Sequence, residues 1–367
     1  MSGPEDGLRR ALQDLAAEFP AYDKVPAGLA SRARRGRLIV ALADIAVVCL
    51  VVTGMVLGIR ALARPGQHWA HGAPPATHVT PMPVGGQIVF VRTPVFGGPT
   101  TAWSDVYVMN PDGTGVRRVL GNSQRAYQSP VWSPDAAKMA LIADPNNAYA
   151  GDGTLAIANA DGSHLHVLRT VTPVSSPAWS PDGRQIAFTE GQGNAIVVVN
   201  ADGSGSRQIV PARNARISGT VGEPSWSPDG RQVAFVAGSA EVGSIYVVDV
   251  HGGDPRRLTS LSAGDSFPAW SPDGKWIAFS RDGARSGIYL MRADGTHVRR
   301  VVSCALPRCV WASGPTWSPG GKAVAFFEST NGGRSQQIFI VSLTNGRVRQ
   351  LTRGPLDNVT PSWQPGW

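Results

Sequence analysis

The segment Pro177-Ala-Trp-Ser-Pro-Asp-Gly-Arg-Gln-Ile-Ala-Phe188 is one copy of a unit that repeats through residues 86–367. Its Pro-x-Trp triplet occurs six times, and successive Trp residues are separated by 47, 47, 44, 47 and 46 residues. A period of roughly 20–50 residues is typical of solenoids and propellers. Pro and Gly at fixed positions would break the helices of a helical repeat, so the unit predicts β-structure. The repeated tryptophans are Trp132, Trp179, Trp226, Trp270, Trp317 and Trp363.

Each unit carries signals for four short strands joined by tight turns. The Trp strand runs into a Ser-Pro-Asp-Gly turn, in which Pro presets φ, Asp caps the turn backbone and Gly takes the positive φ. A second strand is expected at Gln185–Phe188 and a third at Ile196–Val199, and a fourth strand is expected in the next unit at Arg256–Thr259. Ala136 stands where this Gly is expected. It predicts a strained turn, because Gly tolerates positive φ far better than Ala.

This unit closely resembles the WD40-like repeat of TolB-type β-propellers, whose motif reads P-x-W-S-P-D-G-x-x-I-A-F, then I-Y-V-x-x-x-D-G and R-R-L-T. The resemblance covers residues 86–367 and implies an all-β fold of four-stranded blades around a central channel. TolB also carries an additional N-terminal domain, and a transmembrane anchor is expected in its place here. The specific partners of TolB are therefore not transferred to this chain.

The two ends of the repeat region predict a six-bladed β-propeller that is closed by joining them. The region opens with signals for a second, a third and a fourth strand at residues 87–90, 106–109 and 117–120. It ends with a lone first strand at Trp363. Together these four strands complete one blade, and their pairing removes the exposed edges that an open sheet would carry.

The residue between Pro and Trp is small in every repeat. On a strand this residue points to the opposite face from its neighbours. A large Trp on one face and a small residue on the other allow adjacent blades to nest, so we expect the tryptophans to form core. A stacking platform for ligand is the alternative for an aromatic side chain in every repeat. The small residues are Val131, Ala178, Ser225, Ala269, Thr316 and Ser362.

Residues 38–60 predict a single transmembrane helix. Leu38–Ile59 are 22 residues with one charged side chain, Asp44, and a helix of that length rises about 33 Å, enough to cross the hydrocarbon core of a bilayer. The arginines before this span outnumber those after it, which predicts a cytoplasmic N-terminus and an extracytoplasmic propeller at the plasma membrane. A cleaved signal peptide is the alternative, because Ala61-Leu-Ala63 resembles a cleavage site. The length of the apolar stretch and of the preceding tail favours a retained anchor.

The segments that flank this span complete the expected domain organisation. Residues 1–37 are a cytoplasmic tail with a short amphipathic helix, because apolar side chains recur there on one helical face. Residues 61–85 are a Pro-rich linker, which is extended rather than folded. The propeller occupies residues 86–367.

The strand order places the short turns on one face of the ring and the longer connections on the other, which we call the loop face. Loop-face connections span residues 92–104, 143–153, 211–223 and 303–314. Binding sites usually lie on long loops of a rigid scaffold, so the loop face is the expected binding face. Ordinary local packing is the alternative for each of its residues. The candidate binding residues are Trp103, Arg125, Tyr127, Tyr149, Arg213, Arg216, Glu223, Phe267, Arg308 and Trp311.

Cys304 and Cys309 lie in the last of these connections. Outside the membrane they would be oxidised, and their spacing favours a disulfide within the loop. A zinc site is the alternative, but no further Cys or nearby His completes a tetrahedral ligand set.

The sequence favours a binding module over an enzyme. The propeller region has 25 basic and 20 acidic residues, a surplus of five that is spread along the chain, whereas nucleic acid requires a focused basic stripe. No G-x-S-x-G motif occurs, and the seven His residues form no triad or metal cluster. We therefore predict a monomeric, non-catalytic propeller without cofactor or metal. As the TolB-like resemblance implies, it would bind a protein or glycan at the cell envelope. The alternative is a propeller enzyme, similar to polysaccharide lyases or to another hydrolase, with a site at the channel mouth.

Overall fold

The computed structural model describes residues 86–94, 104–121, 126–144, 153–169, 173–191, 194–211, 217, 219–239, 242–260, 264–304 and 309–365. The expected cytoplasmic tail, the span at residues 38–60 and the Pro-rich linker lie outside these ranges. Within them, no helix has the length and apolar character needed to cross a bilayer.

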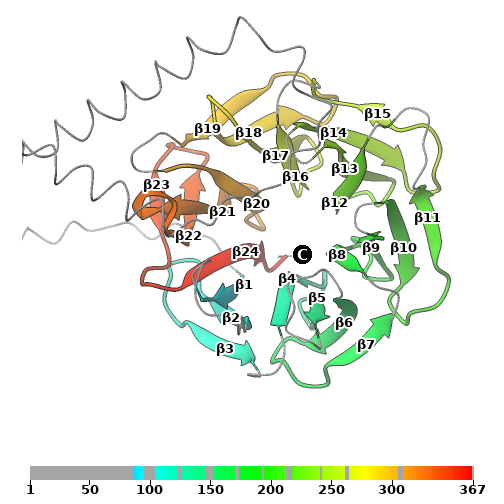
Figure 1. Cartoon of the computed structure of the whole chain (residues 1–367), viewed down its shortest axis with the longest axis horizontal. Coiled ribbons are helices and arrows are strands. Elements are labelled where there is room, and N and C mark those ends of the chain that lie inside the picture. Colours follow the sequence, from blue (N-terminus) through cyan, green and yellow to red (C-terminus); the bar gives the residue numbers. More distant parts are fainter. Residues whose placement is uncertain are drawn as a thin grey trace, which may run out of the picture. The chain divides into compact units, whose positions relative to one another are not determined.

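The described residues form six antiparallel sheets of four strands each, arranged as the blades of a ring (Figure 1). The first strand of each blade lies nearest the centre of the ring and the fourth lies at its rim (Figure 1). Blade 1 comprises β4 (Ala126–Trp132), β5 (Lys138–Asp144), β6 (Thr154–Asn159) and β7 (His166–Arg169); blade 2 comprises β8 (Val174–Trp179), β9 (Gln185–Glu190), β10 (Ala195–Asn200) and β11 (Arg207–Val210); blade 3 comprises β12 (Thr220–Trp226), β13 (Gln232–Ser239), β14 (Val242–Asp249) and β15 (Arg256–Arg257). Blade 4 comprises β16 (Asp265–Trp270), β17 (Trp276–Arg281), β18 (Gly287–Arg292) and β19 (Arg299–Ser303); blade 5 comprises β20 (Ala312–Trp317), β21 (Ala323–Thr330), β22 (Ser335–Ser342) and β23 (Val348–Gln350), with the short 3-10 turn η2 (Asn331–Gly333) between β21 and β22.

Blade 6 joins the two ends of the repeat region, as the sequence predicts. Its strand order is β24 (Asp357–Trp363), β1 (Ile88–Thr93), β2 (Asp105–Met109) and β3 (Arg117–Leu120). In the antiparallel pair of β24 and β1, Ile88 lies opposite Trp363. The amide of Gln364 also donates to the carbonyl of Gln87 at 2.7 Å. The prediction of six four-stranded blades closed by their termini is therefore confirmed.

The hydrophobic core lies between neighbouring blades. Ile196 and Val198 of β10, for example, share a cluster with Trp226 and Phe235 of the next blade. The equivalent tryptophans of the other blades also belong to such clusters or pack against them. The prediction that the repeated tryptophans form core is thus confirmed. Five second strands each bury one Phe completely, and these are Phe90, Phe188, Phe235, Phe279 and Phe326.

The Ser-Pro-Asp-Gly turn is held by side-chain hydrogen bonds. The Ser227 hydroxyl donates to Asp229 Oδ1 at 2.6 Å and accepts from the Gln232 amide at 2.9 Å. Asp229 Oδ1 also accepts from the Arg231 amide at 3.1 Å. The hydrogen bond from Ser227 is the main reason that the pKa of Asp229 falls below its ordinary value. The aspartate of this motif therefore stabilises the turn through hydrogen bonds.

The fourth strand of blade 3 is shorter than the sequence predicts. The expected strand runs to Thr259, whereas β15 ends at Arg257. The hydroxyl of Thr259 accepts a hydrogen bond of 2.9 Å from the Ile245 amide, so a side chain replaces the next backbone partner of the ladder. Thr352 makes the same bond to the Ile338 amide in blade 5. A Thr side chain thus ends strand pairing at the rim of both blades.

Candidate functional site in the central channel

The structure describes four of the ten candidate binding residues of the loop face. Glu223, Phe267 and Tyr127 belong to the first strands of their blades rather than to loops, and Trp311 directly precedes β20. Six candidates lie outside the described residues: Trp103, Arg125, Tyr149, Arg213, Arg216 and Arg308.

Tyr127 is buried, contrary to the prediction that its side chain lies on the loop face for contact with a partner. Its side chain is only 3% exposed and packs in the core cluster that joins blades 6 and 1. Its main chain is fixed by Ser104, whose hydroxyl accepts from the Tyr127 amide at 2.8 Å and donates to the Tyr127 carbonyl at 2.7 Å. The residue lies on the inward side of β4, so it supports the blade interface instead of facing a partner.

Every first strand contains a bulge at the residue that precedes the Pro of the Pro-x-Trp triplet. The pairing register of β12, for instance, shifts between Gly222 and Ser225. The bulged residue takes a positive φ in all six blades, although Pro disfavours helical conformations in the residue before it. Such strained backbone is often found at functional sites. The bulged residues are Ser129 (φ 48°), Ser176 (52°), Glu223 (56°), Phe267 (52°), Gly314 (60°) and Thr360 (47°).

These six bulged residues surround a cavity of about 130 Å³. The prolines that follow them complete its wall, together with the side chain of Phe327 from blade 5. Glu223 is the one ionisable residue among the described residues that line this cavity. The cavity therefore presents a single carboxyl group within a wall of prolines, hydroxyls and two aromatic rings.

Glu223 and Phe267 are in direct contact across the interface between blades 3 and 4. Glu223 Oε2 accepts a hydrogen bond of 2.5 Å from the backbone amide of Phe267. No residue in the described part of the chain donates to the second carboxylate oxygen, Oε1. Burial in the narrow channel raises the pKa of Glu223 to about 7, against the effect of the Phe267 hydrogen bond. The nearby carboxylate of Asp282 adds to this rise. The group is thus poised to exchange a proton or a hydrogen bond near neutral pH.

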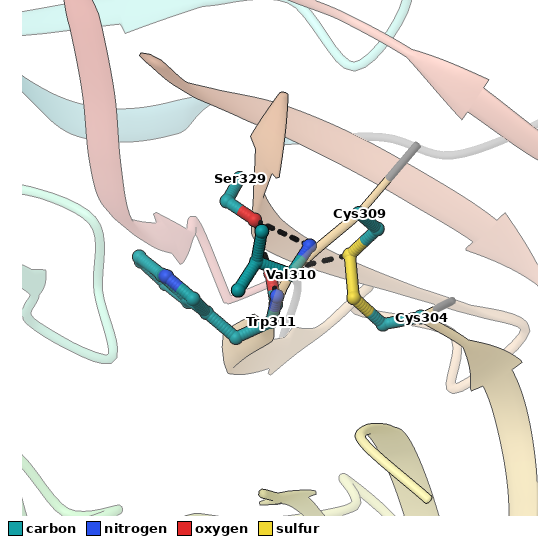
Figure 2. The surroundings of a disulfide bond; sticks show 5 residues. All are labelled: Cys304, Cys309, Val310, Trp311 and Ser329. Atoms are coloured by element: carbon teal, nitrogen blue, oxygen red, sulfur yellow. Dashed lines mark hydrogen bonds between the residues drawn. A yellow bond between two sulfur atoms is a disulfide. The ribbon is translucent and has the colours of Figure 1, made fainter. Parts of the chain in front are cut away.

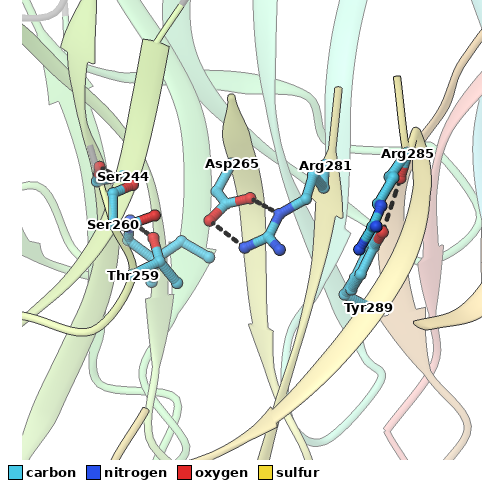
Figure 3. Close-up of polar contacts among 8 residues, drawn as sticks. Ser244, Thr259, Ser260, Asp265, Arg281, Arg285 and Tyr289 are labelled. Atoms are coloured by element: carbon cyan, nitrogen blue, oxygen red, sulfur yellow. Dashed lines mark hydrogen bonds and ion pairs between the residues drawn. The ribbon is translucent and has the colours of Figure 1, made fainter. Parts of the chain in front are cut away.

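A buried ion pair lies next to this site in blade 4. Asp265 is fully buried, and its two oxygens accept from Nε and Nη2 of Arg281 at 2.6 and 2.9 Å (Figure 3). The guanidinium also stacks over the rings of Tyr289 and Phe279, at 4.8 and 5.4 Å from their centroids. Burial of Asp282 itself, together with the charge of Asp265, raises the pKa of Asp282, which follows Arg281 in the sequence. Arg281 therefore compensates the buried charge of Asp265, whereas Asp282 and Glu223 are two nearby carboxyl groups whose pKa values are raised.

Cys304 and Cys309 form a disulfide with a Cα–Cα distance of 5.1 Å (Figure 2). The residues after it are held by Ser329, whose hydroxyl accepts from the amides of Val310 and Trp311 at 2.9 and 3.1 Å (Figure 2). The half-buried ring of Trp311 meets Phe327 edge-on, with 5.4 Å between ring centroids. Because Phe327 lines the channel cavity, Trp311, which follows the disulfide-bonded Cys309, contacts part of the wall of the site.

Comparison with known proteins finds relatives that share the fold of this chain. Residues 146–305 match the family model described as the TolB beta propeller domain. The chain is similar to TolB from Acinetobacter baumannii, with a TM-score of 0.63 and 22% identity over 77% of this chain and 67% of that chain. The propeller is TolB-like. A structure assigned to TolB from Agrobacterium tumefaciens gives a TM-score of 0.56 at 20% identity, covering 77% of this chain and 100% of the other.

The similarity extends to a solved chain with a very different sequence. A chain of the nidogen/laminin complex gives a TM-score of 0.58 at 11% identity, over 75% of this chain and 98% of that chain. A search among curated protein sequences found no match. At these low identities the structural similarity shows the fold alone, and the function of the chain has to be inferred from its own residues.

The channel of this TolB-like propeller combines one carboxyl group with apolar walls. Across the described ranges, no three His, Cys, Asp or Glu side chains come together as a potential metal-binding group. Of the predicted candidates, the structure brings Glu223 and Phe267 together and places Trp311 behind Phe327. Sequence reasoning missed Phe327 and the bulged residues Ser129, Ser176, Gly314 and Thr360, although their position before the Pro of each triplet is a recognisable signal.

Proposed function

We propose that this chain is a non-catalytic binding module, a propeller held outside the plasma membrane by residues 38–60. Its loop face would receive part of a protein or glycan partner at the mouth of the central channel. The observation that carries this proposal is the pairing of Glu223 with Phe267 in the channel wall. Binding of this kind fits the TolB-like fold, which this chain shares with TolB of Acinetobacter baumannii.

The site has the chemistry of a receptor for a hydrogen-bond donor. Glu223 Oε2 is engaged by Phe267, which leaves Oε1 for an N–H or O–H group of a ligand. The prolines and the rings of Phe267 and Phe327 would cover the apolar part of the same ligand. Pockets with apolar walls and a few fixed polar groups are typical of specific binding sites. Both a peptide side chain and a sugar ring meet these requirements.

The disulfide supports an extracytoplasmic position for the propeller. Disulfides persist in oxidising compartments and are rare in the cytosol. The bond between Cys304 and Cys309 lies on the loop face of the propeller. A disulfide in this domain agrees with the extracytoplasmic orientation that the charges around residues 38–60 predict. In the proposed arrangement, an N-terminal anchor and a linker hold a propeller that faces the envelope.

A second candidate function is that of an enzyme with its site at the channel mouth. The observation in its favour is the pKa of Glu223, about 7, because a general acid or base works best when its pKa lies near the working pH. In that case Glu223 would move a proton during turnover instead of holding a partner.

The two functions can be separated with the full-length chain, its Glu223→Gln variant and a control variant, Asp254→Asn, which changes an exposed carboxylate after β14. Wild-type protein is used for affinity capture from envelope extracts and on a glycan array. A genuine partner should bind Glu223→Gln about tenfold more weakly, since a hydrogen bond to a charged group contributes about 1.5–3 kcal/mol. The control variant should bind like the wild type.

Two results would contradict the binding proposal. One is a partner that binds Glu223→Gln and wild-type protein equally well. The other is turnover of a glycan or peptide by the wild type that Glu223→Gln abolishes and Asp254→Asn retains, which would establish the enzyme instead.

A further inference from the structure

A groove opens between blades 4 and 5 on the face of the Ser-Pro-Asp-Gly turns, which we call the turn face. Its volume is about 450 Å³, within the range of about 300–1,000 Å³ that is typical of small-molecule sites. An equivalent groove lies between blades 2 and 3, so the repeat accounts for the shape that the two grooves share. The apolar wall of the groove between blades 4 and 5 comprises Pro272, Leu290, Trp317, Pro319 and Leu343.

Two directly paired residues distinguish blade 4 from the other blades. Trp276 begins β17 and lies opposite Arg292 of β18. In blade 2 the same positions hold Gln185 and Asn200, whose side chains share a hydrogen bond of 3.3 Å. In the other five blades the first position is Gln, Lys or Ala and the second is Asn, Asp or Ser. The scaffold therefore does not require an aromatic ring and an arginine here, and their occurrence together indicates a role particular to blade 4.

Trp276 holds two guanidinium groups beside the groove. Its ring centroid lies 6.0 Å from Cζ of Arg292 and 5.5 Å from Cζ of Arg299, which lines the groove from β19. The attraction of each cation to the aromatic ring offsets part of the repulsion between the two charges. Both arginines are exposed, and neither guanidinium makes a hydrogen bond or an ion pair with any residue in the described ranges. Arg207, the counterpart of Arg299 in the other groove, instead donates to the carbonyl of Val250 in the next blade.

The carboxylates around the two arginines leave the site with a net positive charge. Asp273 lines the groove, but its Oδ2 lies 3.8 Å from Nζ of Lys275. Asp294 lies close enough to Arg292 for their charges to interact. The adjoining turn of blade 5 has Gly320 in place of the usual Asp, so the second carboxylate of the other groove is missing. The two arginines and Lys275 outweigh the two aspartates, and the site therefore favours an anion.

The groove suits a sugar acid better than an acidic peptide. The amides of Gly274 and Gly321, in the two turns that border the groove, donate within their own turns at 2.9 Å each. They therefore offer no donor to the backbone of an extended peptide. The apolar wall and the half-buried ring of Trp276 instead match the C–H faces of a sugar ring, next to charged groups that fix its acidic substituent.

We propose that this groove binds the carboxylate of a sugar acid within an acidic glycan, with Arg292 and Arg299 as its ligands. A guanidinium can donate two parallel hydrogen bonds to a carboxylate, which gives such a contact both strength and direction. The groove shares no lining residue with the cavity around Glu223. The inference is therefore independent of the function proposed for the loop face.

The first test measures binding of defined trimers to the full-length chain in phosphatidylcholine nanodiscs by isothermal titration calorimetry. The probe is cellotriouronic acid, a trimer of glucuronic acid, and it should bind with one-to-one stoichiometry. Its neutral counterpart cellotriose and the peptide triglutamate should each bind at least tenfold more weakly. The proposal would be overturned if the acidic trimer did not bind, if cellotriose bound equally well, or if triglutamate bound as tightly as the sugar acid.

The second test locates the site with charge-removing variants. Arg292→Asn introduces the residue that blade 2 has at this position, and Arg299→Gln changes an exposed side chain, so both variants should keep the fold, which circular dichroism checks. Each should weaken binding of cellotriouronic acid about tenfold or more. Arg184→Gln removes an exposed charge from the turn of blade 2 and should bind like wild type. Wild-type affinity in either blade 4 variant, or an equal loss in Arg184→Gln, would overturn the proposal.

Discussion

The indole Nε1 of Trp226 donates a hydrogen bond of 3.1 Å to the carbonyl oxygen of Ala178 in the preceding blade. Trp317 makes the same bond to Ala269 at 2.9 Å. Ala178 and Ala269 are the small residues that stand between Pro and Trp in their own repeats. Their size thus brings the backbone of one blade within hydrogen-bonding distance of the next tryptophan, and nesting of blades involves polar as well as apolar contacts.

Replacement of Trp226 by Ala should lower the free energy of unfolding by about 3–5 kcal/mol, because it leaves a cavity between blades 2 and 3. Trp226 is 8% exposed and contacts residues of both blades. Trp226→Phe retains most of the apolar contact and should cost less. Urea denaturation followed by circular dichroism measures both values. Val116→Ala, at an exposed position, is the control and should change stability little.

The turn at Ala136 should become more stable when Gly replaces Ala. Ala136 takes a φ of 57°, which agrees with the strain that the sequence predicts. At the equivalent Gly183, an added Cβ would meet nothing closer than 3.7 Å, so the strain is conformational rather than steric. Left-handed backbone costs a non-glycine residue about 1–2 kcal/mol, and Gly loses part of this gain through its greater entropy when unfolded.

Ala136→Gly should therefore raise the free energy of unfolding by about 1 kcal/mol, and Gly183→Ala should lower it by a similar amount. Thermal and urea unfolding of the two variants give the comparison. A destabilised Ala136→Gly protein would show that the turn gains more from the stiffness of Ala than it loses through strain.

The repeat made the architecture predictable. The spacing of the tryptophans and the strand signals at both ends of the repeat region determine six blades and their closure, because each blade buries the same face against its neighbour. Departures such as Ala136 were recognisable for the same reason, since four other copies have Gly at the equivalent position.

The site was predictable only in part, because its contacts join residues that are distant in sequence. Glu223 and Phe267 were both selected for the loop face, but their contact depends on the bulges in two neighbouring first strands. Tyr127 was misplaced because alternation along β4 turns it inward. Asp265 was missed, since the equivalent residue of blade 3 is the apolar Val221, and no repeat pattern marks a buried charge.

The carboxyl group of Glu223 should make stability depend on pH between about 4.5 and 7. Its pKa is about 7 in the folded protein and has an ordinary value of 4.5. The folded state therefore binds more protons in this interval, and the free energy of unfolding falls as the pH rises. The contribution of Glu223 is complete below pH 4.5 and is lost above pH 7, with an upper limit of about 3 kcal/mol.

Urea denaturation of wild type and Glu223→Gln at pH 5, 6, 7 and 8 measures this contribution. The variant keeps an oxygen that can accept from the Phe267 amide, but it cannot ionise. Wild type should lose stability relative to the variant as the pH rises. Parallel curves for the two proteins would show that the pKa of Glu223 is not raised in the folded state.

The ion pair of Asp265 and Arg281 should contribute strongly to the stability of blade 4. Removal of one partner of a buried pair costs about 3–5 kcal/mol, because the other charge stays buried without compensation. Asp265→Ala should therefore be strongly destabilising, since Asp265 is fully buried and binds Arg281 through both oxygens. Blade 6 suggests a milder variant. There, Arg92 stacks over Tyr107 at 4.3 Å and its Nε donates to the neutral side chain of Asn358 at 2.9 Å.

Asp265→Asn reproduces the arrangement of blade 6 in blade 4 and should cost clearly less than Asp265→Ala. A double-mutant cycle with Arg281→Met separates the two effects, because the Met variant removes the charge that Asp265→Ala would leave behind. The double variant Asp265→Ala, Arg281→Met should be more stable than Asp265→Ala alone. If instead the two single losses add up, Asp265 and Arg281 stabilise blade 4 independently, through packing rather than as an ion pair.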